Sequence, residues 1–133
     1  MQQESSIETI ENLLLAFAGG DGEALLSRVD DTIDFRIDHY RDETDVSWQC
    51  ARDKTELMSV LQRLGLEVFP RGTHIETMQS HDLGEGWVLT EFRQTFYYAV
   101  RQKMVRTRNM LLSHSNAGRM DYFRETVASI DNQ

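Results

Sequence analysis

A carboxylate and an aromatic ring stand two residues apart near the end of the sequence, in the segment GRMDYFRETV at 118–127. We expect this segment to form the last β-strand and to follow a tight turn at Gly118, because glycine accepts positive φ without steric cost. Alternate residues of a strand share a face, so Phe123 and Glu125 point to the same side. Glu125 is therefore either an acid inside a pocket or a charge on the surface.

These two placements of Glu125 imply different chemistry. In a water-poor pocket the charged form of a carboxylate is disfavoured, its pKa rises, and the group can act as a general acid or base near neutral pH. At the rim of a sheet, or beside an arginine, the same side chain only carries charge. The sequence leaves both alternatives open.

The segment 87–101 is expected to form a long strand whose two faces differ. One face has no formal charge and suits a pocket wall; it carries Val88, Thr90, Phe92, Gln94 and Phe96. The other face carries Glu91 and Arg93, so we expect it to point outward. Its apolar members, Trp87, Leu89 and Tyr97, offer a surface for a homodimer.

The segment 32–38 alternates apolar and charged residues, which is typical of a half-buried strand. Two orientations are open. If its apolar residues point inward, Asp34 and Arg36 are solvated. If the charged residues point inward, Arg36 can pair with Glu125 and keep it ionised, which suits binding better than acid catalysis.

Four more side chains are candidates for the site or its border. Asn109 can donate a hydrogen bond to a ligand carbonyl if its strand turns that face inward. Trp48 either caps the pocket or packs on the third helix. His39 is either a catalytic histidine or a solvated residue at a strand end. Cys50 is expected to be buried before the third helix.

Helical and strand periodicities predict the elements that must position these residues. The first helix carries Ile7, Ile10 and Phe17 on one face, begins with a capping box at Ser5 and Glu8, and ends at 19–20. A short second helix follows Asp21 and extends to Val29, and a third runs from about Asp53 to Leu64. Strands are expected at 32–38, 74–81, 87–101 and 103–114, followed by the last strand. This order indicates an α+β fold, with a curved antiparallel sheet and helices over one face.

Composition limits the class of protein. The chain has 133 residues, which suits one domain spanning 1–133, and a formal net charge of −8 that argues against nucleic-acid binding. The single cysteine excludes an intrachain disulfide and fits the cytoplasm. We expect no signal peptide and no membrane helix. The four histidines lack metal-ligand spacing, so no metal is expected.

The order of these elements resembles the nuclear transport factor 2-like fold and, within it, the SnoaL-like group that includes polyketide cyclases and ketosteroid isomerases. The resemblance covers about residues 7–127. It rests on the segments GDGEALL at 20–26, DDTIDF at 30–35, ARDK at 51–54 and GRM at 118–120. It implies a cone-shaped sheet packed on three N-terminal helices, with a pocket at the open end.

The resemblance also implies roles for particular residues. Cyclase-like and epoxide-hydrolase-like relatives place a catalytic carboxylate seven residues after the turn glycine, and the matching position is Glu125. Phe92 and Gln94 match the arginine and aspartate of the epoxide hydrolases, so the charge relay of those enzymes is missing. Arg36 matches the base of the isomerases, with Asp34 as its neighbour, which argues against isomerase chemistry at that residue.

We expect a mostly apolar pocket for a small hydrophobic, carbonyl-bearing molecule. If the protein is catalytic, the resemblance implies isomerisation, cyclisation, dehydration or hydration by proton transfer with no cofactor, with Glu125 as acid or base. Arg36, Gln94 or Asn109 would then orient the substrate. The alternative is a non-catalytic ligand-binding or dimerisation module with the same fold.

Overall fold

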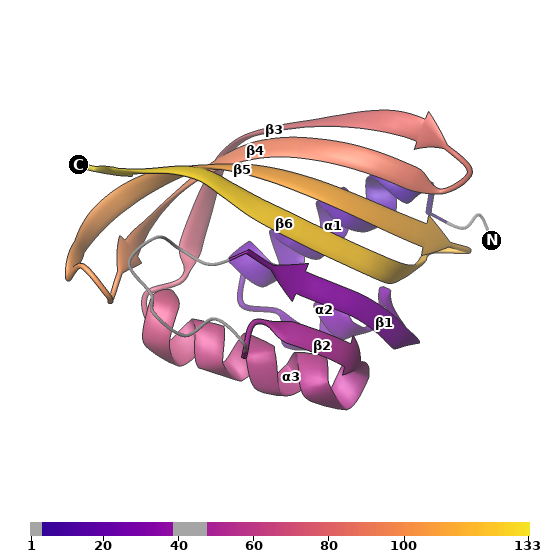
Figure 1. Cartoon of the computed structure of the whole chain (residues 1–133), viewed down its shortest axis with the longest axis horizontal. Helices are drawn as coiled ribbons and strands as arrows, with labels where there is room; N and C mark the ends of the chain where they lie inside the picture. Colours follow the sequence, from indigo (N-terminus) through magenta and orange to yellow (C-terminus); the bar gives the residue numbers. More distant parts are fainter. Residues whose placement is uncertain (1–3, 39–47) are drawn as a thin grey trace.

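The computed structural model of the chain describes residues 4–38 and 48–133 (Figure 1). Helices α1 (Ser6–Ala18) and α2 (Gly22–Leu26) come first, followed by β1 (Val29–Ile37), β2 (Cys50–Asp53) and α3 (Lys54–Arg63). A five-residue π-helix, η1 (Leu64–Val68), continues α3. The strands β3 (Thr73–Gly84), β4 (Trp87–Tyr98), β5 (Lys103–Asn116) and β6 (Arg119–Asn132) complete the fold.

Local sequence signals set the helix boundaries. The expected capping box is present, because the Glu8 amide donates to Ser5 Oγ at 3.1 Å and the Ser5 amide donates to Glu8 Oε1 at 3.0 Å. Asp21 caps α2 by accepting from the Ala24 amide, and Asp53 caps α3 by accepting from the Glu56 amide. Val29 begins β1 rather than ending the second helix.

The six strands form one strongly curved sheet in the order β2-β1-β6-β5-β4-β3. The helices cover its concave side, as the α+β expectation required, with α1 beneath β3 to β6 and α3 beneath β1 and β2 (Figure 1). Two details differ from the expected antiparallel sheet. β1 pairs in parallel with β6, with Phe35 opposite Phe123, and the short edge strand β2 precedes α3.

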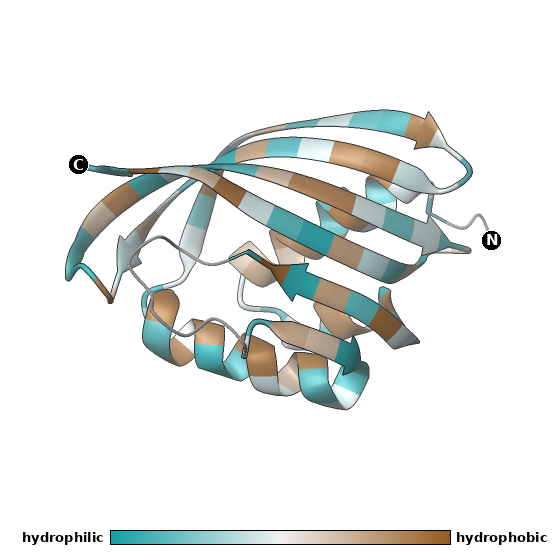
Figure 2. Cartoon of the chain, viewed as in Figure 1, coloured by the Kyte–Doolittle hydropathy of each residue, from teal (hydrophilic) through white to brown (hydrophobic). Residues whose placement is uncertain are grey.

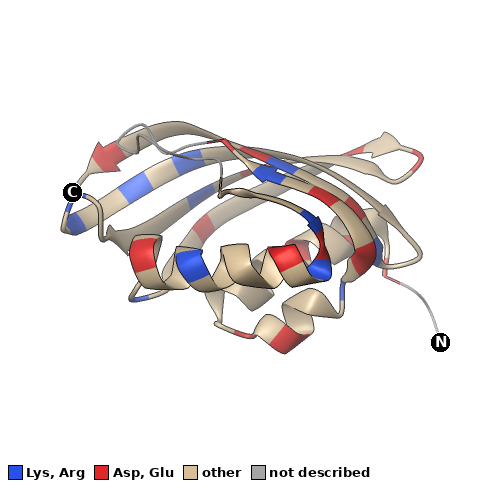
Figure 3. Ribbon diagram, turned by 60° about the horizontal axis from the view of Figure 1, so that its bottom comes forward, with Lys and Arg blue, Asp and Glu red and all other residues tan. Residues whose placement is uncertain are grey.

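Hydrophobic and hydrophilic residues alternate along much of the strands (Figure 2), and the alternation of buried and exposed residues defines an inner and an outer face of the sheet. On β4 the expected charge-free set is buried, from Val88 to Phe96, while Arg93 is exposed. On β5 the inner face carries Thr107 and Asn109, and Arg106 and Arg108 are exposed on the outer one. Figure 3 shows basic and acidic residues along the helices and strands. None of the helices in the described part of the chain is long and apolar enough to cross a membrane.

Candidate functional site

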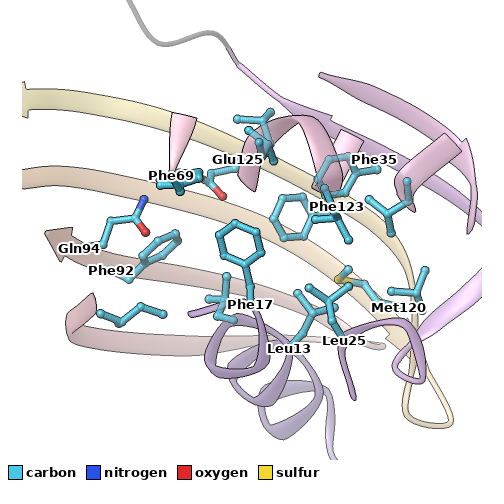
Figure 4. A pocket seen from close by; sticks show the side chains of 17 residues that line it. Leu13, Phe17, Leu25, Phe35, Phe69, Phe92, Gln94, Met120, Phe123 and Glu125 are labelled. Carbon is cyan, nitrogen blue, oxygen red and sulfur yellow. The ribbon is translucent and has the colours of Figure 1, made fainter. Parts of the chain in front are cut away.

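A cavity lies between the helices and the inner face of the sheet (Figure 4). Side chains from α1, α2, α3, η1 and four of the strands, β1, β3, β4 and β6, form its wall, together with Phe69 after η1. The wall is apolar except at two residues, Gln94 of β4 and Glu125 of β6. Phe35 and Phe123 stack in this wall with their ring centroids 4.6 Å apart.

Glu125 reaches the cavity because β6 lies in the middle of the sheet. Its neighbours across the ladder are Ile37 of β1 and Leu111 of β5, both buried, and Glu125 itself is only 6% exposed. Placing a carboxylate among such neighbours costs free energy unless the group is neutral or hydrogen-bonded. The structure supplies one hydrogen-bond donor.

That donor is Asn109, a diagonal neighbour of Glu125 on the same face of the sheet. Asn109 Nδ2 donates to Glu125 Oε2 at 2.7 Å, and Thr107 Oγ1 donates to Asn109 Oδ1 at 2.6 Å. Asn109 and Thr107 are both fully buried. The chain of hydrogen bonds therefore fixes one carboxylate oxygen, while Oε1 has no hydrogen-bond partner among the described residues.

Burial raises the pKa of Glu125 from its usual 4.5 to about 7. The hydrogen bond from Asn109 opposes this shift, and the charge of Asp38 adds to it. Within 4–38 and 48–133, no lysine or arginine forms an ion pair with Glu125. The carboxyl can therefore hold or release a proton near neutral pH, as a general acid or base must.

Gln94 supplies the other polar group of the wall. Its Oε1 accepts a hydrogen bond from Thr73 Oγ1 at 2.9 Å. Its Nε2 has no partner in the part of the chain that the structure describes, and Gln94 projects into the same cavity as Glu125 (Figure 4). An oxygen atom of a ligand can thus accept from an amide N–H and from a protonated carboxyl.

The two candidates on β1, Asp34 and Arg36, lie outside the cavity. Asp34 and Arg36 are exposed, because Ile33, Phe35 and Ile37 occupy the inward positions of β1. Arg36 stands opposite Arg124, which is also exposed. The alternative in which Arg36 pairs with Glu125 is therefore wrong, and the solvated orientation is found.

The remaining candidates divide between the cavity and its surroundings. Phe92 and Phe123 line the cavity. Phe96 does not line it; its ring is buried and packs edge-on against that of Phe69, with the ring centroids 4.4 Å apart. Trp48 is not on the cavity wall; it lies under the guanidinium of Arg63, 4.4 Å from the ring centroid, and so packs on α3.

Two expectations about single residues remain. Cys50 is exposed, not buried as expected, because it lies on the edge strand β2 opposite Arg36. His39 falls outside the described residues.

Sequence reasoning missed Phe17 and Phe69 as parts of the cavity wall, and Thr107 as the partner of Asn109. Phe17 lies on the predicted apolar face of the first helix, and the sequence assigned that face to the core and not to the cavity wall. Thr107 was detectable, because it stands two residues before Asn109 on the same predicted strand.

No family model and no curated protein matches the chain. Solved structures do match it along nearly their full length. A protein from Rhodopseudomonas palustris, named provisionally as an isomerase, is 18% identical, with 97% of this chain and 93% of that one covered and a TM-score of 0.69.

Two further structures extend the comparison. A nuclear transport factor 2-like protein from Burkholderia thailandensis is 18% identical, with 96% and 92% covered and a TM-score of 0.72. A protein from Pseudomonas putida, named provisionally as a polyketide cyclase, is 11% identical, with 92% and 90% covered and a TM-score of 0.73. At sequence identities of 11–18%, the similarity shows that this chain shares the fold of these proteins.

Proposed function

We propose that this chain, which has the nuclear transport factor 2-like fold, is a SnoaL-like small-molecule-binding protein that acts on a hydrophobic carbonyl compound by cofactor-independent acid–base catalysis. The observation that carries the proposal is the state of Glu125. Its carboxyl is buried in an apolar wall, has a pKa of about 7 and is held through one oxygen by Asn109.

The geometry supports a separate role for each of Glu125, Gln94 and Asn109. The ionised Glu125 takes a proton from the carbon next to a ligand carbonyl, and the protonated Glu125 returns it at another position. The amide N–H of Gln94 stabilises negative charge that develops on the carbonyl oxygen. Asn109 keeps the Glu125 carboxylate in one orientation throughout.

The names of two of the similar proteins agree with this chemistry. One is named provisionally as an isomerase and the other as a polyketide cyclase, and reactions of both types can proceed by acid–base proton transfer. The fold alone does not decide the activity, because one fold hosts many functions. The proposal for this chain therefore rests on Glu125, and the names only favour the reaction type.

The test is exchange of the hydrogens next to the carbonyl of small ketones in deuterated water, followed by NMR. We expect the protein to accelerate this exchange and Glu125→Gln to slow it by about 10²–10⁴-fold, the usual contribution of a general acid–base group. Glu91→Gln is the matched control, because Glu91 lies on the outer face of β4. Equal exchange rates for the wild type and Glu125→Gln would refute the catalytic role.

A second candidate is a non-catalytic binding or dimerisation module. The size of the cavity favours it, because only about 40 Å³ is open to the centre of a water molecule, which is room for a few water-sized groups. The expected dimer surface is partly occupied, since Trp87 packs on Tyr122 and Arg71 lies over the ring of Tyr97. Ketone binding without hydrogen exchange, together with a dimer in sedimentation equilibrium, would favour this candidate.

A further inference from the structure

A groove on the helical side of the molecule adjoins the cavity. The C-terminal end of α1, the start of α2, the region of α3 and η1, and the start of β3 form it. Four of its lining residues, Phe17, Leu25, Leu61 and Phe69, also line the cavity that holds Glu125. The two spaces therefore share a wall.

The two spaces differ in size. The centre of a water molecule can occupy about 320 Å³ in the groove and about 40 Å³ in the cavity. The cavity holds the two polar groups, Glu125 and Gln94, but has room only for the part of a ligand that reacts. Any larger part of the same ligand must lie elsewhere, and the groove is the adjoining space.

Glycines keep the groove open. Gly20, Gly22, Gly65 and Gly72 all line it, and a Cβ atom built at any of them would meet no atom within 4 Å. Gly20 and Gly72 have positive φ, and this backbone conformation accounts for glycine at those two positions. Gly22 and Gly65 do not have positive φ, so their backbone conformation does not require glycine. Larger residues at those two positions would fit the backbone and would occupy the groove.

The wall between the two spaces is apolar. The rings of Phe17 and Phe69 lie edge to face with centroids 5.5 Å apart, and both belong to the shared wall. Phe69 follows the π-helix, and its amide donates to the carbonyl of Leu64 at 2.8 Å. π-Helical turns are frequent at functional sites. A ligand that extends from the groove into the cavity must part these two rings, which a thin polymethylene chain does with less displacement than a ring system.

The groove also limits the charge of its occupant. The ionisable residue in its lining is Asp21, whose carboxylate already accepts from the Ala24 amide as the cap of α2. Thr73, which lines the groove, holds Gln94 of the cavity through its hydroxyl. The outer space therefore suits a neutral apolar chain, and its inner border leads to the polar groups of the cavity.

We infer that the groove is a second subsite, which holds the unbranched apolar tail of a ligand whose carbonyl head lies between Gln94 and Glu125. This inference rests on the proposed function for the position of the head. It narrows the substrate class from hydrophobic carbonyl compounds to those with a flexible, uncharged alkyl tail. Compact polycyclic ketones without such a tail should bind more weakly.

The test uses methyl ketones of increasing length, from butanone through methyl butyl ketone to methyl hexyl ketone, titrated by NMR. We expect the affinity of the wild type to rise by up to about fourfold per added methylene, the usual gain for burying this group. Gly65→Phe and Gly22→Phe should abolish the gain and leave the affinity for butanone unchanged. Ser59→Phe, on the exposed face of α3, is the matched control.

The outcomes separate the two proposals. If longer ketones gain nothing, or if the gain survives both glycine substitutions, the tail subsite is refuted while the role of Glu125 stands. If the matching alkanes bind as tightly as the ketones and lose affinity in Gly65→Phe, the subsite stands and the carbonyl site at Glu125 fails. If the wild type binds none of these ketones, both proposals fail.

Discussion

Glu125 and Glu76 lie on opposite faces of the same curved sheet, and their carboxylates meet opposite surroundings. Glu125 faces the apolar cavity, and burial raises its pKa to about 7. Glu76 is exposed on β3 and accepts hydrogen bonds from Thr95 and, at 3.0 Å, from Arg106 Nε. These hydrogen bonds, first that of Thr95, lower the pKa of Glu76.

The comparison shows what separates a candidate catalytic acid from a structural charge. Both groups are glutamates on long strands, and both have a side-chain donor. Only Glu125 is buried and has no cation partner among residues 4–38 and 48–133, so only its pKa lies near neutral pH. Each of the following substitutions changes the carboxyl group itself, its burial, its hydrogen-bond donor or its ion pair.

The largest effect is expected from Phe123→Ala, which opens the wall beside Glu125. Removing a buried phenylalanine should lower the free energy of unfolding by about 3–5 kcal/mol. Water then reaches the carboxyl, so the pKa of Glu125 should fall toward 4.5. Denaturant unfolding and a ¹³C NMR titration of Glu125 measure the two effects.

Phe96→Ala is the control for the wall, because Phe96 is equally buried but does not line the cavity. It should cost similar stability and leave the pKa of Glu125 unchanged. If Phe123→Ala also leaves that pKa unchanged, contact with the apolar wall is not what raises it.

Glu125→Gln should change how stability depends on pH. The folded pKa lies above the unfolded value, so the unfolded chain releases its proton first as the pH rises from about 4.5 to about 7. The wild type should therefore lose about 3 kcal/mol across this window and nothing more from this group above it. The variant lacks this loss, which urea unfolding at a series of pH values will reveal. Stability curves that run parallel would contradict the burial of a protonated carboxyl.

Asn109→Leu removes the donor that stabilises the carboxylate. We expect a loss of about 1–3 kcal/mol in the free energy of unfolding, because buried polar atoms lose their partner. The pKa of Glu125 should rise further, since the Asn109 hydrogen bond lowers it. NMR titration of Glu125 in the variant tests the direction, and a fall in that pKa would show that Asn109 does not act on the carboxylate.

The smallest effect is expected from Glu76→Gln on the outer face. The pair of Glu76 and Arg106 is exposed, and surface ion pairs contribute little and are screened by salt. Thermal unfolding of this variant should differ only slightly from that of the wild type, and the difference should vanish at roughly molar salt. If the variant remains less stable than the wild type at high salt, the ion pair on the outer face contributes more than a screened surface charge, and the contrast drawn between Glu76 and Glu125 fails.

Much of the fold was predictable from periodicity. The apolar spacing of the first helix, the caps at Ser5 and Asp21, the start of the third helix near Asp53 and the alternation along β4 are local signals, and each is confirmed. The strand β2 was not predictable in this way, because CARD at 50–53 has no alternation or β-branched residue. The parallel pairing of β1 with β6 joins distant segments, and no local pattern specifies it.

The site was predictable only one strand at a time. Parity placed Phe123 and Glu125 on one face, and both line the cavity. The contact between Asn109 and Glu125 depends on the register of β5 against β6, which shifts between Arg108 and Asn109. Such a bulge leaves no signal in the sequence of either strand. Asn109 was a candidate donor from the sequence, but its hydrogen bond to Glu125 could be found only in the structure.

The parallel pairing of β1 and β6 also has a consequence for how the protein is made. β1 finds its central neighbour only in the strand that follows every other described element, with Val29 opposite Met120. Pairings so distant in sequence make folding slow, since a long loop must close first. On the ribosome, β1 therefore lacks one of its two neighbours in the sheet until β6 emerges. The strand that brings Glu125 into the cavity is also the strand that joins β1 and β2 to the rest of the sheet.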